Sequence, residues 1–420
     1  MTFEKELLTG NAAVATAVRL AGVEYIPAYP ITPQTEIIEL LSKWIDEGKM
    51  QSRIVLMDSE HSMMSAAGAA AVTGVRTFTA SSSQGLLYAF EMLYNVAGWR
   101  APIVLANVSR ALAAPITLEP DHNDVLSARG SGFIQIHCET CQEVIDSILM
   151  AYRIAEDGRV RLPAIVNLDG FYLSYTREPV QVPDQKLVEE FLPEYSPPEG
   201  YICASNPMSV ASAVLDGRAY SYFKYQMHLA SLNALEVHER AASDFERLFG
   251  RKYGLAEEFM LQDADYVLVT TNSFSTMAKA AAVDLRKAGK KVGILRIRMV
   301  RPFPRAAIAR MLAGKKGVAV FDQNISVGSG GILYPEILAA LYHQSDRPKR
   351  ILSFIGGLGG KRLSSAEFRH MLSAVASEAE QDYLHMQSVL LFTDQDWGSV
   401  KGMLRIAGKA VPEETKEDAH

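Results

Sequence analysis

Short apolar runs alternate with helical hydrophobic patterns through the first part of the chain. Helices are predicted where apolar residues recur every three or four positions, near residues 11–21, 33–47, 60–73, 84–97 and 141–155. Strands are predicted at the short apolar runs Tyr25–Ala28, Ile54–Met57, Thr77–Ala80, Ile103–Val108 and Ala164–Leu168. Strands separated by crossover helices form a parallel sheet, so the pattern predicts an α/β fold.

A second alternation of the same kind begins at Asp265. Its predicted strands are Tyr266–Thr270, Lys291–Ile297, Val318–Phe321 and Ile351–Phe354, and its predicted helices cover 274–288, 304–313 and 331–342. We therefore expect a second α/β unit after the first.

The segment between the two alternations differs in composition. Residues 175–205 are rich in proline and polar side chains, which predicts an extended strap without a core strand. Residues 218–260 predict a long amphipathic helix that leads into a connector. The expected organisation is a first domain over 1–255, which includes strap and connector, a second domain over 256–395, and a tail over 396–420. The acidic, polar end of that tail is expected to fray.

Composition narrows the class of protein. The 420 residues are 48% hydrophobic and 21% charged, as in ordinary globular proteins, and at about 150 residues per domain they allow two or three domains. A formal net charge of −6 gives no overall attraction for phosphate backbones or anionic lipid, so we expect neither nucleic acid nor a membrane as a partner. The N-terminal stretch lacks signal-peptide features and three cysteines are too few for a disulfide framework, so we expect a cytoplasmic protein.

Polar residues follow several predicted strands, at the ends where ligands bind in parallel sheets. The sequence YPITP joins the first strand to its helix; Thr32 can cap that helix, while Pro30 and Pro33 stiffen the loop. Glu60 opens a helix rich in alanine and glycine, which another backbone or a flat ligand could approach closely. Each feature taken alone also has a structural explanation, namely a rigid loop and the preference for acids in the first turn of a helix.

Two further turns carry polar groups. The serine-rich stretch 81–85 can present backbone N–H groups, but it lacks the lysine of a GxxxxGK[ST] nucleotide loop. Arg110 lies just beyond an apolar strand, where a guanidinium can hold a small carboxylate with two hydrogen bonds; a surface arginine is an equally good interpretation. Because the carboxyl ends of parallel strands meet at one edge, Thr32, Glu60 and Arg110 are expected to converge.

Together these motifs resemble the α subunit of the 2-oxoacid:ferredoxin oxidoreductases, of which pyruvate:ferredoxin oxidoreductase is the best-known member. The resemblance covers nearly the whole chain. In the first unit it rests on YPITP, the acid-headed Ala/Gly helix with FTASSSQGL, SRALAAP, DHNDVLSARGSGFIQ and LPAIVNLDGF. After it come FGRKYGL, IRMVRPFP, VFDQNISVGSGGILYPEI and IGGLGG.

The resemblance implies a thiamine-diphosphate pyrimidine-binding-like parallel-sheet domain followed by a transketolase-C-terminal-like α/β domain. Glu60 matches the glutamate that shares a proton with N1′ of the cofactor's aminopyrimidine, which favours the 4′-imino form able to remove the thiazolium C2 proton. Thr32 and Arg110 match positions that contact the 2-oxoacid. Pro30 and Ser83 are assigned to cofactor binding on the same resemblance.

The implied reaction is CoA-dependent oxidative decarboxylation of a 2-oxoacid to an acyl-CoA and CO2. Thiamine diphosphate would be shared with a β subunit that holds its diphosphate and Mg²⁺, and [4Fe–4S] clusters in γ/δ electron-transfer subunits would pass electrons to ferredoxin, or to NAD through another subunit. No metal ligands are assigned to this chain. Cys138 and Cys141 supply two thiols where such a cluster needs four, and we expect them to be reduced and partly buried.

The substrate side chain is the least determined feature. Pyruvate is the default 2-oxoacid for the family. The LEPDHND segment at 118–124 departs from pyruvate-type relatives, and if it borders the side-chain pocket it would admit a larger group, such as the aryl group of phenylglyoxylate, giving benzoyl-CoA, with branched 2-oxoacids behind it.

Two other classes of function remain open. A noncatalytic docking subunit would keep the fold without the chemistry, but Thr32, Glu60 and Arg110 are all present. A flavin or nicotinamide dehydrogenase is disfavoured because no GxGxxG follows a strand with a trailing acid, and the VGSGG glycines predict tight turns.

Overall fold

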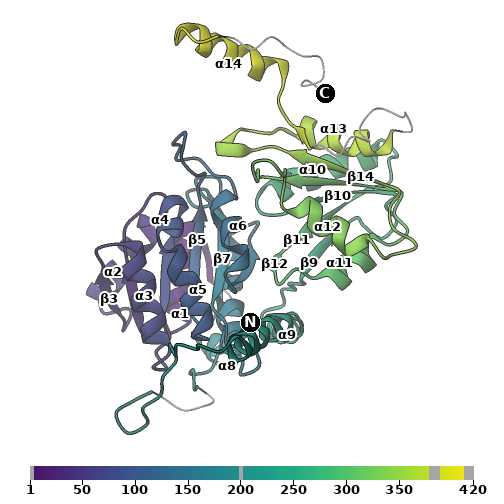
Figure 1. The fold of residues 1–420 in the computed structure, drawn as a ribbon. Coiled ribbons are helices and arrows are strands. Elements are labelled where there is room, and N and C mark those ends of the chain that lie inside the picture. Colours follow the sequence, from purple (N-terminus) through teal and green to yellow (C-terminus); the bar gives the residue numbers. More distant parts are fainter. Residues whose placement is uncertain (1–3, 198–201, 378–387, 411–420) are drawn as a thin grey trace.

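A computed structural model of the protein describes residues 4–197, 202–377 and 388–410. Two α/β units lie side by side, the first coloured purple to teal and the second green (Figure 1). Both units are built on mainly parallel sheets, which confirms the fold class expected from the sequence.

The first sheet has the strand order β12-β6-β7-β5-β4, and β4, β5, β7 and β6 run parallel. A parallel pair, β2 and β3, extends it, because an isolated bridge joins Tyr25 of β2 to Thr77 just before β4. The strands are β2 (Tyr25–Ala28), β3 (Arg53–Leu56), β4 (Phe78–Ser81), β5 (Val104–Ser109), β6 (Ile134–His137) and β7 (Ala164–Asp169). β6 was not predicted, although all four of its residues are buried.

The helices of this unit follow the predicted positions closely. The predicted helix at 84–97 is divided into two at Ala89, whose ψ of 0° leaves the helical range. The helices are α1 (Gly10–Leu20), α2 (Thr35–Asp46), α3 (Glu60–Ala71), α4 (Ser83–Tyr88), α5 (Phe90–Gly98), α6 (Asn123–Ser127) and α7 (Cys141–Ala155), with a 3₁₀ turn η1 (Ala128–Gly130).

The strap contains more regular structure than its composition predicts. Its strand β8 (Arg177–Val182) pairs antiparallel with β1 (Glu4–Thr9), outside the central sheet. A short helix, α8 (Gln185–Phe191), then buries Val188 and Phe191. The strap is therefore a surface layer, and as expected it contributes no strand to the central sheet. Its residues 198–201 lie outside the described part of the chain.

The connector is the 33-residue helix α9 (Gly217–Phe249). It ends at Gly250, whose φ of +70° suits glycine because other residues rarely adopt that conformation. The stretch 218–260 was predicted to hold a long helix and the connector after it; the helix ends at Phe249, and β9 (Ala256–Phe259) already belongs to the second sheet.

The second sheet has the order β15-β14-β13-β10-β11-β9, in which only β9 is antiparallel to its neighbour. Its other strands are β10 (Tyr266–Thr270), β11 (Val292–Ile297), β13 (Gly317–Asp322), β14 (Arg350–Ile355) and β15 (Val389–Leu390). The accompanying helices are α10 (Phe274–Lys287), α11 (Arg305–Leu312), α12 (Leu333–Leu341), α13 (Ser365–Ala376) and α14 (Asp394–Ile406), with a 3₁₀ turn η2 (Leu358–Gly360). The tail thus begins with a helix, α14, that stands away from the body (Figure 1); its fraying end, 411–420, lies outside the described residues.

The two units are joined by a strand, an apolar core and an ion cluster in which Glu143 of α7 pairs with Arg296 and Arg298. β12 (Met299–Arg301) follows β11 in the chain yet pairs antiparallel with β6 of the first sheet. One continuous set of buried apolar residues includes Val125 and Phe133 of the first unit as well as Ile297 and Val300 of the second.

None of the described helices has the length and apolarity needed to cross a bilayer.

Candidate active site

Glu60 lies at the first position of α3, directly after the carboxyl end of β3. The Ser59 hydroxyl accepts a hydrogen bond from Ser62 N at 3.2 Å and so caps the helix. Since Ser59 caps the helix, the Glu60 carboxyl is not needed as a cap. The residue is only 6% exposed. The glycine of the Ala/Gly-rich helix serves packing: a Cβ at Gly68 would lie 2.6 Å from the Val96 side chain of α5.

The turn between β4 and α4 leaves room for the Glu60 carboxyl. Gly85 lies in the first turn of α4, and a Cβ there would lie 2.5 Å from Glu60 Oε1 and 2.9 Å from Ser81 Oγ, so a larger residue would displace the Glu60 carboxyl. The side chains of Ser81, Ser82 and Gln84 each have a buried polar atom without a hydrogen-bond partner in the described structure. Buried polar groups are normally paired, so this arrangement points to a polar ligand. The residues present thus fit the aminopyrimidine of thiamine diphosphate.

Ser83, in contrast, already has partners within the chain. Its backbone N–H donates to Asp124 Oδ2 at 3.0 Å and its hydroxyl donates to the Ala111 carbonyl at 2.7 Å. Its φ of +48° is uncommon for a serine, and the two bonds hold it in that conformation. They fix the turn beside Gly85, and the cofactor contact assigned to Ser83 stays a prediction.

Arg110 and Thr32 are brought together at the ends of β5 and β2. Arg110 Nη1 donates to the Thr32 carbonyl at 3.1 Å, and Nε donates to the Thr117 carbonyl at 2.8 Å. Burial lowers the pKa of Arg110, and the charge of Asp124 opposes that shift. In the described part of the chain no carboxylate lies within salt-bridge distance of this guanidinium, although the residue is only 7% exposed. A nearly buried cation without an anionic partner is costly, so the arrangement favours binding of a carboxylate ligand.

Thr32 does not cap the following helix, which corrects the sequence prediction. α2 begins at Thr35 with Gln34 at the capping position, because Gln34 N donates to the Ile31 carbonyl and its side chain donates to the Tyr29 carbonyl at 2.9 Å. The loop thus makes its own turn before the helix starts. Thr32 and Pro30 are left exposed at the edge of the site.

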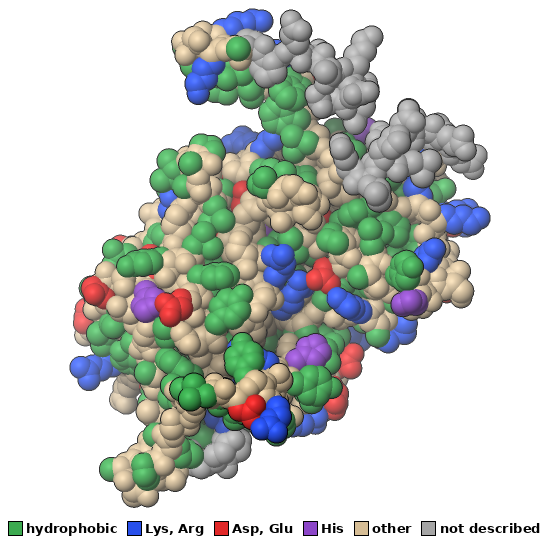
Figure 2. Space-filling view, viewed as in Figure 1, with side chains coloured by type: hydrophobic (Ala, Val, Ile, Leu, Met, Phe, Trp, Pro, Cys, Tyr) green, Lys and Arg blue, Asp and Glu red, His purple; other side chains and the backbone are tan. Residues whose placement is uncertain are grey.

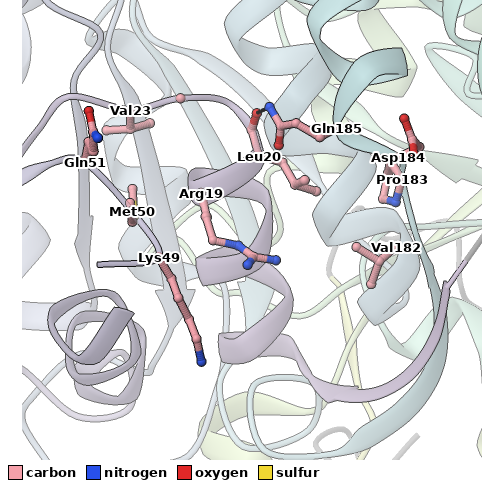
Figure 3. A pocket seen from close by; sticks show the side chains of 11 residues that line it. Arg19, Leu20, Val23, Lys49, Met50, Gln51, Val182, Pro183, Asp184 and Gln185 are labelled. Atoms are coloured by element: carbon pink, nitrogen blue, oxygen red, sulfur yellow. Dashed lines mark hydrogen bonds between the residues drawn. The ribbon is translucent and has the colours of Figure 1, made fainter. Parts of the chain in front are cut away.

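A separate cavity lies at the opposite end of the first sheet. It has a volume of about 560 Å³ and is lined by the end of α1, the loop before β3 and the start of α8, with Arg19 between Lys49 and Gln185 (Figure 3). Since α1 ends just before β2 begins, this cavity is at the amino ends of the strands, whereas Glu60 and Arg110 lie at the carboxyl ends. It is therefore separate from the candidate active site.

The first unit matches the thiamine-diphosphate-binding domain of pyruvate flavodoxin/ferredoxin oxidoreductases over residues 16–243, more than half of the chain. The chain belongs to this oxidoreductase family. Residues 264–368 match core domain II of pyruvate:ferredoxin oxidoreductase. The family resemblance stated from the motifs is thereby confirmed.

Curated members of the oxidoreductase family align over almost their whole length. Pyruvate synthase subunit PorA of Methanothermobacter thermautotrophicus is 41% identical over 87% of this chain and 94% of its own. PorA of Pyrococcus furiosus is 41% identical over 85% of this chain and 90% of its own. Ketoisovalerate oxidoreductase subunit VorA of Pyrococcus abyssi is 40% identical over 87% of this chain and 92% of its own.

Solved structures show the same fold at lower identity. 2-Oxoglutarate:ferredoxin oxidoreductase from Magnetococcus marinus superposes with a TM-score of 0.68 at 18% identity, over 89% of this chain and 66% of that chain. This chain thus covers just under two thirds of the length of the 2-oxoglutarate:ferredoxin oxidoreductase chain. A split-gene transketolase gives a TM-score of 0.50 at 11% identity, over 88% of this chain and 98% of its own.

Sequence reasoning missed one residue that organises the site of this oxidoreductase-family chain. Asp124 Oδ2 accepts hydrogen bonds from Ser83 N, Arg110 N and Asn107 Nδ2, at 3.0 to 3.1 Å. Burial raises the pKa of Asp124 to about 6, although these donors oppose the shift. Asp124 stands in the DHNDVLSARGSGFIQ segment that carries the family resemblance, but nothing in the sequence pattern shows which residues its carboxylate binds.

The CxxC cysteines are buried as separate thiols. Cys138 Sγ lies 3.8 Å from the Glu143 carbonyl, and Cys141 Sγ lies 3.6 Å from the Thr176 carbonyl. Burial raises the pKa of Cys138 to about 12 and raises that of Cys141 further. Thiols held in the protonated form are poor nucleophiles and poor metal ligands, so the structure favours the structural interpretation of this motif.

Proposed function

We propose that the chain is the α subunit of a thiamine-diphosphate-dependent 2-oxoacid:ferredoxin oxidoreductase. The proposal rests above all on Arg110, a nearly buried guanidinium without a salt bridge in the described structure. The buried Glu60, whose carboxyl lies against Gly85 of α4, supports it. Family membership supplies the reaction class: a 2-oxoacid and coenzyme A give an acyl-CoA and CO2, and a pair of electrons passes to iron–sulfur acceptors.

Each site residue has a defined task in this proposal. Arg110 pairs with the 2-oxoacid carboxylate, and Thr32 at the same edge donates its hydroxyl to a carboxylate or carbonyl oxygen. Glu60, a buried carboxyl, would hold or release a proton at N1′ of the bound aminopyrimidine. When bound, thiamine diphosphate supplies the nucleophilic carbon and the electron sink for decarboxylation. Pro30 and Ser83 shape the loops on either side.

Pyruvate is the proposed substrate, because several relatives at about 40% identity are pyruvate synthase subunits. A branched 2-oxoacid is the second candidate, since ketoisovalerate oxidoreductase subunits match almost as well. Phenylglyoxylate is the third candidate substrate, because only the sequence of residues 118–124 supports it.

The partner subunits are proposed from the exposed apolar surface around the site. Leu56 at the end of β3, Tyr88 at the end of α4 and Ile116 beyond Arg110 are 69%, 62% and 74% exposed. Figure 2 shows hydrophobic side chains on the face formed by α3 and α5. Exposed apolar residues next to a candidate site are typical of a subunit interface. We assign this face to a β subunit that carries the cofactor's diphosphate and Mg²⁺; γ/δ subunits would carry the [4Fe–4S] clusters and serve ferredoxin, or NAD through another subunit.

The test is an anaerobic assay of the complex purified with its native partner subunits. Reduction of methyl viologen is followed with coenzyme A and pyruvate, 2-oxoglutarate, 2-oxoisovalerate or phenylglyoxylate. We expect the highest kcat/KM with pyruvate. A purified, cofactor-loaded complex that turns over none of the four would favour the noncatalytic docking subunit, and a preference for another acid would reassign the substrate without changing the reaction class.

A further inference from the structure

The run Asp121–Asp124 connects the Arg110 loop to the second unit. Three of its four residues bond to turns of the second unit that follow β13 and β14. The contacts are Gly359 N to Asp121 Oδ2 at 3.3 Å, His122 N to the Gln323 carbonyl at 2.9 Å, and Ile325 N to Asn123 Oδ1 at 3.2 Å. Just before the run, Gly360 N donates to the Pro120 carbonyl at 2.8 Å.

The fourth residue of the run faces the candidate active site. Asp124 Oδ2 accepts from the backbone N–H of Arg110 at 3.1 Å. At the other end of the same segment, the Thr117 carbonyl accepts from Arg110 Nε at 2.8 Å. Residues 117–124 therefore hold both the backbone and the guanidinium of Arg110, and the second unit holds residues 120–123.

A buried ion pair reinforces this connection. His122 Nε2 lies 2.8 Å from Asp169 Oδ1, and both side chains are essentially inaccessible. Asp169 also accepts from Asn272 Nδ2 at 3.1 Å and from Ser273 N at 3.0 Å, and both donors belong to the second unit. The Asp169 carboxylate is thus held by hydrogen bonds from three residues. Because His122 is one of them, residues 121–124 have little freedom to move independently of the second unit.

We propose that Asp121, His122, Asn123 and Asp124 are positioning residues through which the second unit sets the place of the Arg110 guanidinium, and hence the affinity for the 2-oxoacid carboxylate. The inference rests on the proposed role of Arg110. It gives the DHND run a role different from lining the substrate side-chain pocket. None of the four residues need touch the substrate.

The test compares Asn123→Ala with Asn123→Asp in the complete complex. Alanine removes the acceptor for Ile325 N, whereas aspartate keeps an oxygen there. We expect Asn123→Ala to raise KM for pyruvate about two- to thirtyfold, the range seen when a coupling contact is lost. The kcat and the Kd for thiamine diphosphate should stay near wild type, and Asn123→Asp should restore KM. A purely structural role would instead lower assembly or cofactor binding together with activity.

A double-mutant cycle with Arg110→Ala separates this inference from the proposed function. If Asn123 acts through Arg110, Asn123→Ala adds no further increase in KM once Arg110 is absent. If Arg110→Ala leaves KM unchanged, the proposed carboxylate anchor is wrong. If Arg110→Ala raises KM but Asn123→Ala has no effect, or the same effect in both backgrounds, the positioning inference is overturned. Asp121→Ala, with Asp121→Asn as its control, repeats the test should Asn123→Ala fail to assemble.

Discussion

Arg110 Nη1 donates to the backbone carbonyl of Thr32 across 3.1 Å, although the two residues are 78 positions apart in the chain. The contact ties the end of β5 to the loop after β2. Backbone carbonyls accept hydrogen bonds from the guanidinium, but in the described structure it has no salt bridge, so a substrate carboxylate could still pair with it at this edge of the sheet.

Removal of the guanidinium should weaken pyruvate binding. We expect Arg110→Ala to lose about 2 to 4 kcal/mol in kcat/KM, since a charge-assisted pair in a largely dry site is worth that much. Arg110→Lys should fall in between, because lysine keeps the charge but not the planar fork. Steady-state kinetics of the complex measure the effect. Arg53→Ala, at an exposed position of β3, is the control, and an unchanged kcat/KM for Arg110→Ala would remove it as the anchor.

Glu60→Gln should abolish turnover while the complex still assembles. The amide keeps the shape of the side chain but cannot exchange a proton with N1′, so kcat should fall about a hundredfold or more. Viologen reduction gives kcat, and size-exclusion chromatography checks assembly. The exposed Glu39→Gln on α2 is the matched control. Substantial turnover by Glu60→Gln would show that another group activates the cofactor.

Gly85→Ala should lower kcat through a steric clash with the Glu60 carboxyl, without removing any functional group. The added Cβ would lie 2.5 Å from Glu60 Oε1, which forces the carboxyl to move, and a displacement of this size costs about a hundredfold in rate. Gly98→Ala on α5 meets no atom within 4 Å and should keep full activity. A wild-type kcat for Gly85→Ala would mean that the Glu60 carboxyl works from a different position.

The ion cluster between the units should govern acid stability. The buried Glu143 carboxylate accepts from Arg296 and Arg298 of the second unit, and although burial alone would raise its pKa, these two charges hold the pKa at about 2. This folded pKa lies below the unfolded value of 4.5, so its stabilisation is present above pH 4.5 and is lost as the pH falls toward 2.

Glu143→Gln should accordingly lower the free energy of unfolding at neutral pH by about 3 to 5 kcal/mol, as expected when one partner of a buried ion pair is removed. Thermal unfolding as a function of pH is the measurement. The melting temperature of the variant should depend less on pH between 4.5 and 2 than that of the wild type. Glu258→Gln, exposed on β9, should behave like wild type; identical pH profiles for Glu143→Gln and wild type would contradict the assignment.

The three cysteines should differ sharply in reactivity. A hydrogen bond with Ser205, whose hydroxyl lies 3.1 Å away, lowers the pKa of the exposed Cys203, while Cys138 and Cys141 are buried with raised pKa values. Iodoacetamide at pH 8 should therefore label Cys203 first. Mass spectrometry of the labelled peptides identifies the site, and Cys203→Ser should remove the fast phase. Rapid labelling of Cys138 would mean that the segment between β6 and α7 opens far more readily than the burial of this thiol suggests.

Periodicity predicted most of the fold because each α/β repeat is locally encoded. The helix Cys141–Ala155 and the strands Tyr25–Ala28 and Tyr266–Thr270 begin and end where the patterns place them. β12 was missed because Met299–Arg301 follows β11 almost directly, and only its pairing with β6 distinguishes it from a continuation of that strand.

For the candidate site, the sequence predicted only which residues lie at the carboxyl ends of the strands. Parallel-sheet geometry led to the expectation that Thr32 and Arg110 converge, and the structure shows them in contact. The role of Asp124 was not foreseeable, because its hydrogen bonds join it to Ser83 and Arg110, 41 and 14 positions away. Tertiary contacts of this kind leave no periodic trace in a sequence.

The strand β12 also has a consequence for how the protein is made. The first sheet emerges from the ribosome with β6 as an exposed edge, and the neighbouring strand β12 is synthesised only after α9 and three strands of the second sheet, β9, β10 and β11. An unpaired edge recruits other strands, so the nascent first unit is prone to aggregation until residues 299–301 arrive. A fragment that ends at residue 255 lacks β12, so its β6 edge would stay unpaired.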